Sequence, residues 1–184
     1  MSVQTRATID DLYRVEGKAE LIGGRIVRYM ASGFRPSRAA FRIGPSLDDY
    51  ATQVSRGYAN ADGLGYVVPE LPSGRESFEP DASYYDGHLP ANEMRFIEGP
   101  PTFAVEVRSE NDYGPVADSE YAAKRDDYFQ AGTKAVWDVA PLARTIHCYT
   151  AAAPTQPRVF SAGDTADAEP AVPGWRVAVD WVFG

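Results

Sequence analysis

The most informative segment of this sequence is the apolar run Thr102-Phe103-Ala104-Val105-Glu106-Val107-Arg108. A near-continuous apolar run of this length predicts a strand near the middle of a sheet. Successive side chains of a strand point to opposite faces, so Glu106 shares its face with Ala104 and Arg108. A buried carboxylate is costly unless it is paired with a cation or bound to a metal. Glu106 is therefore either half of an ion pair, for example with Arg108, or a metal ligand, and taken alone it favours the ion pair.

The segments that follow this run predict a layered fold. A helix is expected over about 118–131, with Gly132 placed to end it in a left-handed C-cap. Ala135–Val139 and Thr145–Tyr149 are typical of two more strands. The helix can serve as the crossover that leads from the first strand to the next one. The predicted fold class is α/β, with a mixed central β-sheet flanked by helices in a single domain over residues 1–184.

The N-terminal half predicts shorter elements. We expect a helix at 8–13 capped by Thr8, a hairpin over 20–29 that turns at Gly23-Gly24, and strands at 65–68 and 78–85. Apolar residues at three- and four-residue steps predict an amphipathic helix over 40–54, which Gly44-Pro45 should kink or divide in two. Loops are expected over 86–101 and over most of 151–174, apart from a short strand at 158–160.

Composition excludes several classes of protein. The 184 residues carry 26 acidic and 18 basic side chains, and this net charge of −8 disfavours non-specific binding to nucleic acid or anionic membrane, although a local basic groove could exist. One cysteine and two histidines argue against disulfides and against zinc sites rich in these residues. No apolar leader or membrane-length run is found, so we expect a soluble, cytoplasmic protein without a membrane partner. Phosphate-loop, dinucleotide-binding, α/β-hydrolase and zinc-protease motifs are absent from the sequence.

A second acidic residue, Asp81, favours the metal-ligand interpretation of Glu106. Asp81 follows Pro80, which suits the start or the edge of a strand. The segment between Asp81 and Glu106 contains a loop, which allows their two strands to become neighbours. Two carboxylates on one face of a sheet would form an oxygen-rich site for a hard divalent cation.

Lys124 is the third candidate residue. It falls three residues after Tyr121 and four before Tyr128, so it lies on or beside the apolar face of the predicted helix. A lysine in that place either extends to solvent or meets a buried acid. The simpler alternative is a surface ion pair with Glu120, worth about 0.3–0.5 kcal/mol.

Together these residues resemble the Uma-type family of restriction-endonuclease-like proteins, within the PD-(D/E)XK nuclease superfamily. The resemblance extends over most of the chain, and its specificity comes from the order and spacing of short pieces. The pieces are Ala19–Val27, Pro80–Ala82, Val105–Ser109, Lys124–Tyr128, Gly132 and Trp137–Pro141.

The resemblance implies a restriction-endonuclease-like core and a Mg²⁺ or Mn²⁺ site. Its metal ligands would be Asp81, Glu106 and the carbonyl of Val107. Lys124 matches a catalytic lysine that the family has moved from the strand to the following helix, and Glu20 matches an additional acid near the metal.

Arg108 departs from the superfamily pattern, because it occupies the lysine position of the strand motif. Arginine stays protonated and is a poor general base, whereas a lysine desolvated beside a metal can have its pKa lowered enough to take a proton. Arg108 lies two residues from Glu106 on the same strand face, so we expect it to contact substrate as a fixed cation.

Two functions remain open from the sequence. The first is a Mg²⁺-dependent endodeoxyribonuclease that hydrolyses phosphodiester bonds in DNA, with Asp81, Glu106, Lys124 and Glu20 as its catalytic residues. The second is a catalytically weak or inactive nuclease-fold protein that acts as a binding or assembly module. The apolar tail around Trp175 and Val182 could pack on a second subunit and form a homodimer, but packing on the chain's own core is the favoured interpretation.

Overall fold

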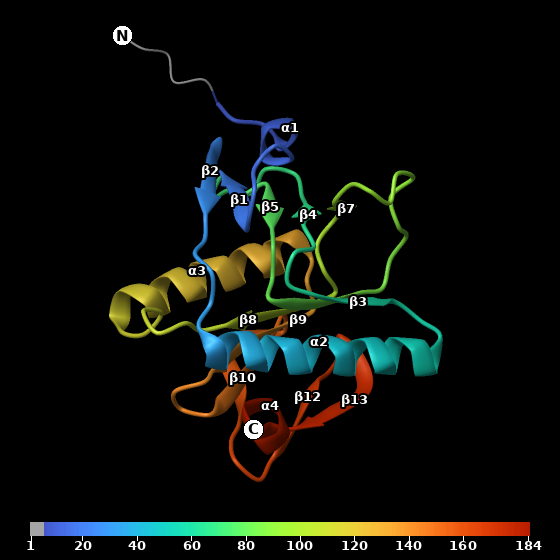
Figure 1. The fold of residues 1–184 in the computed structure, drawn as a ribbon, viewed down its shortest axis with the longest axis vertical. Helices are drawn as coiled ribbons and strands as arrows, with labels where there is room; N and C mark the ends of the chain where they lie inside the picture. The colour runs from blue at the N-terminus through green and yellow to red at the C-terminus, as the bar shows by residue number, and fades with distance from the viewer. Residues whose placement is uncertain (1–5) are drawn as a thin grey trace.

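The computed structural model describes residues 6–184, and its centre is a six-stranded mixed sheet (Figure 1). The strands follow the order β11-β10-β9-β8-β6-β3 across the sheet. Their bounds are β3 Tyr58–Ala61, β6 Ala82–Tyr85, β8 Phe103–Val107, β9 Ala135–Ala140, β10 Thr145–Thr150 and β11 Ala153–Phe160. β8 and β9 are parallel, and the other neighbours are antiparallel. The predicted α/β class with a mixed central sheet is confirmed.

Two helices cover opposite faces of this sheet, as Figure 1 shows: α2 (Phe34–Val54) on one side and α3 (Pro115–Ala131) on the other. The α2 face holds the larger core, in which Phe103 and Val105 are fully buried. The α3 face buries Ala104 against Tyr128 of that helix. All five residues of β8 are buried, and Glu106 contacts Lys124 and Tyr128 of α3, so it lies in the layer between the sheet and that helix. The helix α3 is the predicted crossover, and it ends at Gly132 in the left-handed conformation.

The helix α2 is one continuous element, so of the kink or division expected at Gly44-Pro45 the division is wrong. Proline removes one hydrogen bond of the helix, but the buried face of α2 continues across it with Ile43 and Leu47, both fully buried. That packing on the sheet compensates for the lost bond. Gly44 serves the same contact, because a Cβ at this position would lie 3.0 Å from the Cβ of Ala61 on β3.

Small elements surround the α3 side of the sheet. The first are α1 (Ile9–Leu12), capped by Thr8 as predicted, and the hairpin of β1 (Ala19–Ile22) and β2 (Arg25–Arg28). A three-stranded sheet consists of β4 (Tyr66–Val67), β5 (Ser77–Phe78) and β7 (Ile97–Glu98). The run 78–85, expected as one strand, is therefore two: β5 pairs with β4, and β6 joins the central sheet. The chain changes sheets at Pro80 and Asp81, because proline cannot donate to a ladder.

The C-terminal segment contains more strand than its composition indicates. Instead of a loop over most of 151–174, the structure has β11, β12 (Thr165–Ala168) and β13 (Val172–Ala178), followed by α4 (Val179–Phe183). The small residues Ala166 and Ala168 alternate into the core, and they carry a weak sequence signal for a strand. The tail residues Trp175 and Val182 are buried in the same chain's core, as favoured. Within residues 6–184, no helix has the length and apolar character needed to cross a membrane.

Candidate functional site

Asp81 and Glu106 lie opposite one another on neighbouring antiparallel strands. Ala82 pairs with Val105, so the next step of this register places Asp81 across from Glu106. The Asp81 amide donates to the carbonyl of Val105 at 2.9 Å, and the Val107 amide donates to Oδ2 of Asp81 at 2.7 Å. Residues opposite each other in an antiparallel pair direct their side chains to the same face. The structure therefore brings these two predicted site residues together, with Val107 beside them.

Lys124 of α3 bridges two carboxylates. Its Nζ lies 2.8 Å from Oε1 of Glu106 and 3.0 Å from Oε1 of Glu20, and its side chain is 14% exposed. Tyr128, one turn further along the helix, donates its hydroxyl to the same Glu106 oxygen at 2.6 Å. Glu120, the alternative partner, is exposed on the helix and forms no ion pair with Lys124 within residues 6–184. The helical spacing therefore delivers Lys124 to the acids of the sheet.

Glu20 is fully buried at the start of the β1–β2 hairpin, and each of its oxygens is occupied. Oε2 accepts from the Tyr29 hydroxyl at 2.7 Å and from the guanidinium of Arg75, while Oε1 accepts from the Glu79 amide at 3.0 Å. Arg75 also pairs with Asp127 of α3 at 2.8 Å. Arg75 is itself buried, so it holds the hairpin to α3 and is not a surface cation for a nucleic acid.

The surroundings set opposite pKa shifts on the two glutamates. Burial disfavours the ionised form of Glu20, but Lys124 and Arg75 outweigh it and hold its pKa at about 2. Burial, opposed by Lys124 but reinforced by the neighbouring carboxylate of Asp81, raises the pKa of Glu106. Burial also disfavours the charged form of Lys124, yet Glu106 and Glu20 overcome it and raise the lysine pKa. The two acids therefore favour the protonated, cationic form of Lys124.

Lys18 is a site residue that the sequence analysis missed. Its Nζ lies 2.5 Å from Oδ1 of Asp81 and 3.0 Å from Oδ1 of Asp62. Burial opposes its charge, but Asp81 and Glu106 outweigh it and raise its pKa. The alternation of side chains along a strand could have found it, because Lys18 lies just before β1 and precedes Glu20 by two residues. We refer to Lys18, Glu20, Asp81, Glu106 and Lys124 as the carboxylate–lysine cluster.

Arg108 lies beside the cluster, but its guanidinium is already engaged. It donates to both carboxylate oxygens of Asp138 at 2.7 and 2.8 Å. It also contacts Asp118 at 2.5 Å and the carbonyl of Asp112 at 2.9 Å. Asp138 is the register partner of Glu106 on β9, so Arg108 does share the Glu106 face as predicted. These contacts tie the start of α3 to β9, and the expected contact of Arg108 with substrate stays a prediction.

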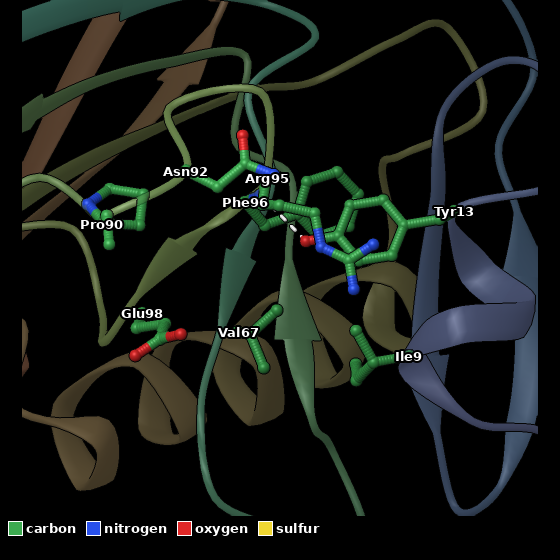
Figure 2. A pocket seen from close by; sticks show the side chains of 9 residues that line it. Ile9, Tyr13, Val67, Pro90, Asn92, Arg95, Phe96 and Glu98 are labelled. Atoms are coloured by element: carbon green, nitrogen blue, oxygen red, sulfur yellow. Dashed lines mark hydrogen bonds between the residues drawn. The ribbon is translucent and has the colours of Figure 1, made fainter.

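The space around the cluster is narrow. A cavity of about 10 Å³, close to the volume that one water centre needs, is lined by Glu106, Tyr121, Lys124, Arg125, Tyr128, Val136 and Asp138. A hollow of about 490 Å³ lies elsewhere, where Figure 2 shows Tyr13, Arg95 and Phe96 gathered beside the strand that carries Val67. The residues lining this hollow include no member of the carboxylate–lysine cluster. The candidate chemistry therefore lies apart from the larger hollow.

The donor set of the cluster fits a hard divalent cation. Among residues 6–184, Oδ1 of Asp81 contacts the Lys18 ammonium, and Oε2 of Glu106 accepts no hydrogen bond. Over the same residues, no three Asp, Glu, His or Cys side chains form a complete metal cage. Mg²⁺ is commonly held by one or two carboxylates, with waters and substrate phosphates completing the shell. Asp81 and Glu106 suit that mode of binding.

The six-stranded mixed sheet and its flanking helices form a nuclease-like α/β fold. A solved structure from Anabaena variabilis, described as "a putative nuclease", resembles this chain with a TM-score of 0.72. The two are 17% identical, and the match covers 96% of this chain and 97% of the other, which shows a shared fold. The family model described as "Putative restriction endonuclease" matches residues 8–180, so the chain belongs to the Uma2 family. No curated protein matches the chain.

Proposed function

We propose that this chain is a divalent-metal-dependent endonuclease that hydrolyses phosphodiester bonds in DNA. The observation that carries the proposal is the placement of Asp81 directly across from Glu106, with Lys124 between Glu106 and Glu20. Membership of the Uma2 family and the nuclease-like fold support the same reaction class. Mg²⁺ or Mn²⁺ is the cation that the oxygen donors favour.

Each residue of the cluster has a role in this proposal. Asp81 and Glu106 would hold the cation, with the Val107 carbonyl as a further ligand. When bound, the cation would polarise the scissile phosphate and lower the pKa of a water. Lys124 would stabilise negative charge that develops on the phosphate, and its protonated state suits that task. Glu20 would be a positioning residue, because it is fully buried and pairs with the Lys124 ammonium at 3.0 Å.

A second candidate function is a binding or assembly module without cleavage. The observation that favours it is the neutralisation of both metal-facing acids by the chain's own lysines, Lys18 on Asp81 and Lys124 on Glu106. A net charge of −8 also opposes the binding of a polyanion.

Cleavage assays distinguish the two functions. Supercoiled, linear double-stranded and single-stranded DNA are incubated with the wild type and Mg²⁺ or Mn²⁺, with EDTA as the metal-free arm. The nuclease proposal expects cleavage that requires the metal and is lost in Glu106→Gln. Glu120→Gln is the matched control, because this exposed glutamate lies on α3 outside the cluster, and it should cleave like the wild type. Equal product with Glu106→Gln would refute the assignment, and no product on any form would favour the module.

A further inference from the structure

Lysine residues are rare in this chain, and most of them lie in the carboxylate–lysine cluster. Only three of the 18 basic residues are lysines: Lys18, Lys124 and Lys134. Two of the three meet at the carboxylate–lysine cluster, whereas Lys134 is exposed on the loop before β9. Arginine forms a rigid fork with several donors, whereas lysine carries a compact charge on a flexible stem. The cations of the cluster that pair with Asp81 and Glu106 are therefore lysines, which separate from a carboxylate more readily than arginine does.

The Lys18 side chain is anchored at one end and shared at the other. Its carbonyl accepts from the Tyr29 amide at 2.9 Å, which fixes the backbone in the hairpin. Its ammonium touches Asp81, whose side chain is 15% exposed, and Asp62, whose side chain is 59% exposed. The two contacts mark an inner partner and an outer partner for the same charge.

The inner contact occupies the oxygen that a metal would use. Oδ2 of Asp81 already accepts from the Val107 amide, so Oδ1 is the oxygen that remains for a cation. The Lys18 ammonium is 2.5 Å from Oδ1, and a divalent cation would bind such an oxygen at about 2.0–2.6 Å. The ammonium and the ion therefore claim the same position.

We propose that Lys18 holds the place of the divalent cation on Asp81 in the metal-free protein, and gives it up when the cation binds. The displaced ammonium keeps its contact with Asp62 and stays at the rim of the site. This inference rests on the proposed metal-dependent function and adds a positioning residue to it. Lys18 then sets the metal affinity, because binding must break one ion pair.

Two measurements test the exchange without relying on cleavage. The first follows the lysine ammonium signals of ¹⁵N-lysine-labelled protein by NMR as Mg²⁺ is added, with Lys18→Met used to assign the Lys18 signal. The Lys18 signal should move on addition of Mg²⁺, and the Lys134 signal should not. The second measures the dissociation constant for Mn²⁺ by calorimetry, which should fall about tenfold in Lys18→Met, equivalent to about 1.4 kcal/mol. Lys134→Met is the matched control and should bind like the wild type.

Asp62→Asn should change the metal affinity in the opposite direction. This variant should fold, since the Asp62 side chain is exposed. Without its outer partner the displaced lysine is left unpaired, so Mn²⁺ should bind about two- to fivefold more weakly, the range of an exposed ion pair. If Lys18→Met does not fold, Asp62→Asn still decides the question, because the loss of its contact should shift the Lys18 signal and so assign that signal for the NMR titration.

The possible failures are distinguishable. If Mn²⁺ binds the wild type through Glu106, but the Lys18 signal stays unmoved and neither variant changes affinity, the exchange is refuted and the metal site stands. If the wild type binds neither Mg²⁺ nor Mn²⁺, the exchange and the proposed metal-dependent function fall together.

Discussion

Replacing Lys124 by methionine removes the charge that two buried carboxylates share. Glu20 keeps Arg75 in this variant, but Glu106 loses the only cation within ion-pair distance among residues 6–184. Leaving a buried charge without its partner costs about 3–5 kcal/mol. Because the Lys124 side chain is 14% exposed, we expect the lower end, a loss of about 3 kcal/mol in the free energy of unfolding.

The assay is urea unfolding followed by tryptophan fluorescence and circular dichroism. Trp137 and Trp175 are buried in the core and report its loss. The loss corresponds to a fall in Tm of about 6–12 °C for a chain of this size. Lys134→Met, on the exposed third lysine, should stay within about 0.5 kcal/mol of the wild type.

A double variant tests whether the unpaired Glu106 is the cause. Adding Glu106→Gln to Lys124→Met should recover stability, because the buried charge is removed with its partner.

The pH dependence of the Lys124→Met loss has a defined sign. A carboxyl group with a raised pKa in the folded protein loses stability as pH rises, so the Lys124→Met deficit should shrink toward acid pH. A loss below about 1 kcal/mol in Lys124→Met would refute this reasoning. So would a double variant whose loss equals the sum of the losses in Lys124→Met and Glu106→Gln.

Other predictions follow from the same contacts. The pKa of Glu20 is held at about 2 in the folded protein, against an ordinary 4.5, so its ionised form stabilises the fold and this gain is lost as the pH falls. In urea unfolding, the free energy of unfolding of the wild type should fall by about 3 kcal/mol more than that of Glu20→Gln between pH 5 and pH 2. Arg108→Ala should cost about 3 kcal/mol in unfolding free energy, because it leaves Asp138 without its bidentate partner. In single-turnover cleavage, Lys124→Ala should lower the rate by about 10²–10⁴-fold, with Mn²⁺ affinity nearly unchanged by calorimetry. Mn²⁺ at about 100 times its Kd should stabilise the wild type by about 2.7 kcal/mol in urea, and Asp81→Asn should abolish this gain.

Local periodicity predicted the parts of the site that depend on one element. The alternation of β8 places Glu106 on the α3 face, because side-chain direction in a strand is set by parity. The three- and four-residue steps around Lys124 likewise direct it to the sheet, where it meets Glu106. These features require no knowledge of distant segments, so sequence alone could supply them.

Features that depend on distant segments were beyond local patterns. Arg75 is one of many arginines in the sequence, and only the approach of the hairpin to α3 buries it against Glu20 and Asp127. Lys18 is two residues from Glu20, as alternation along a strand requires. Its partner Asp62 follows β3, and only the order of strands in the sheet brings the end of β3 close to Lys18. Tertiary packing decides such pairs, and a single sequence carries no direct signal for them.

The sheet arranges its charges in a row, and the type of cation changes along it. Continuing the registers places Asp62, Asp81, Glu106 and Asp138 at one level across four adjacent strands. Arg108 binds Asp138 at one end through two parallel bonds, whereas the other three acids meet lysines. An arginine fork fixes geometry, and a lysine leaves a carboxylate by breaking a single contact. The row is therefore held by an arginine fork at β9 and by lysine contacts at Asp81 and Glu106, the two acids that bind the cation in the proposed function.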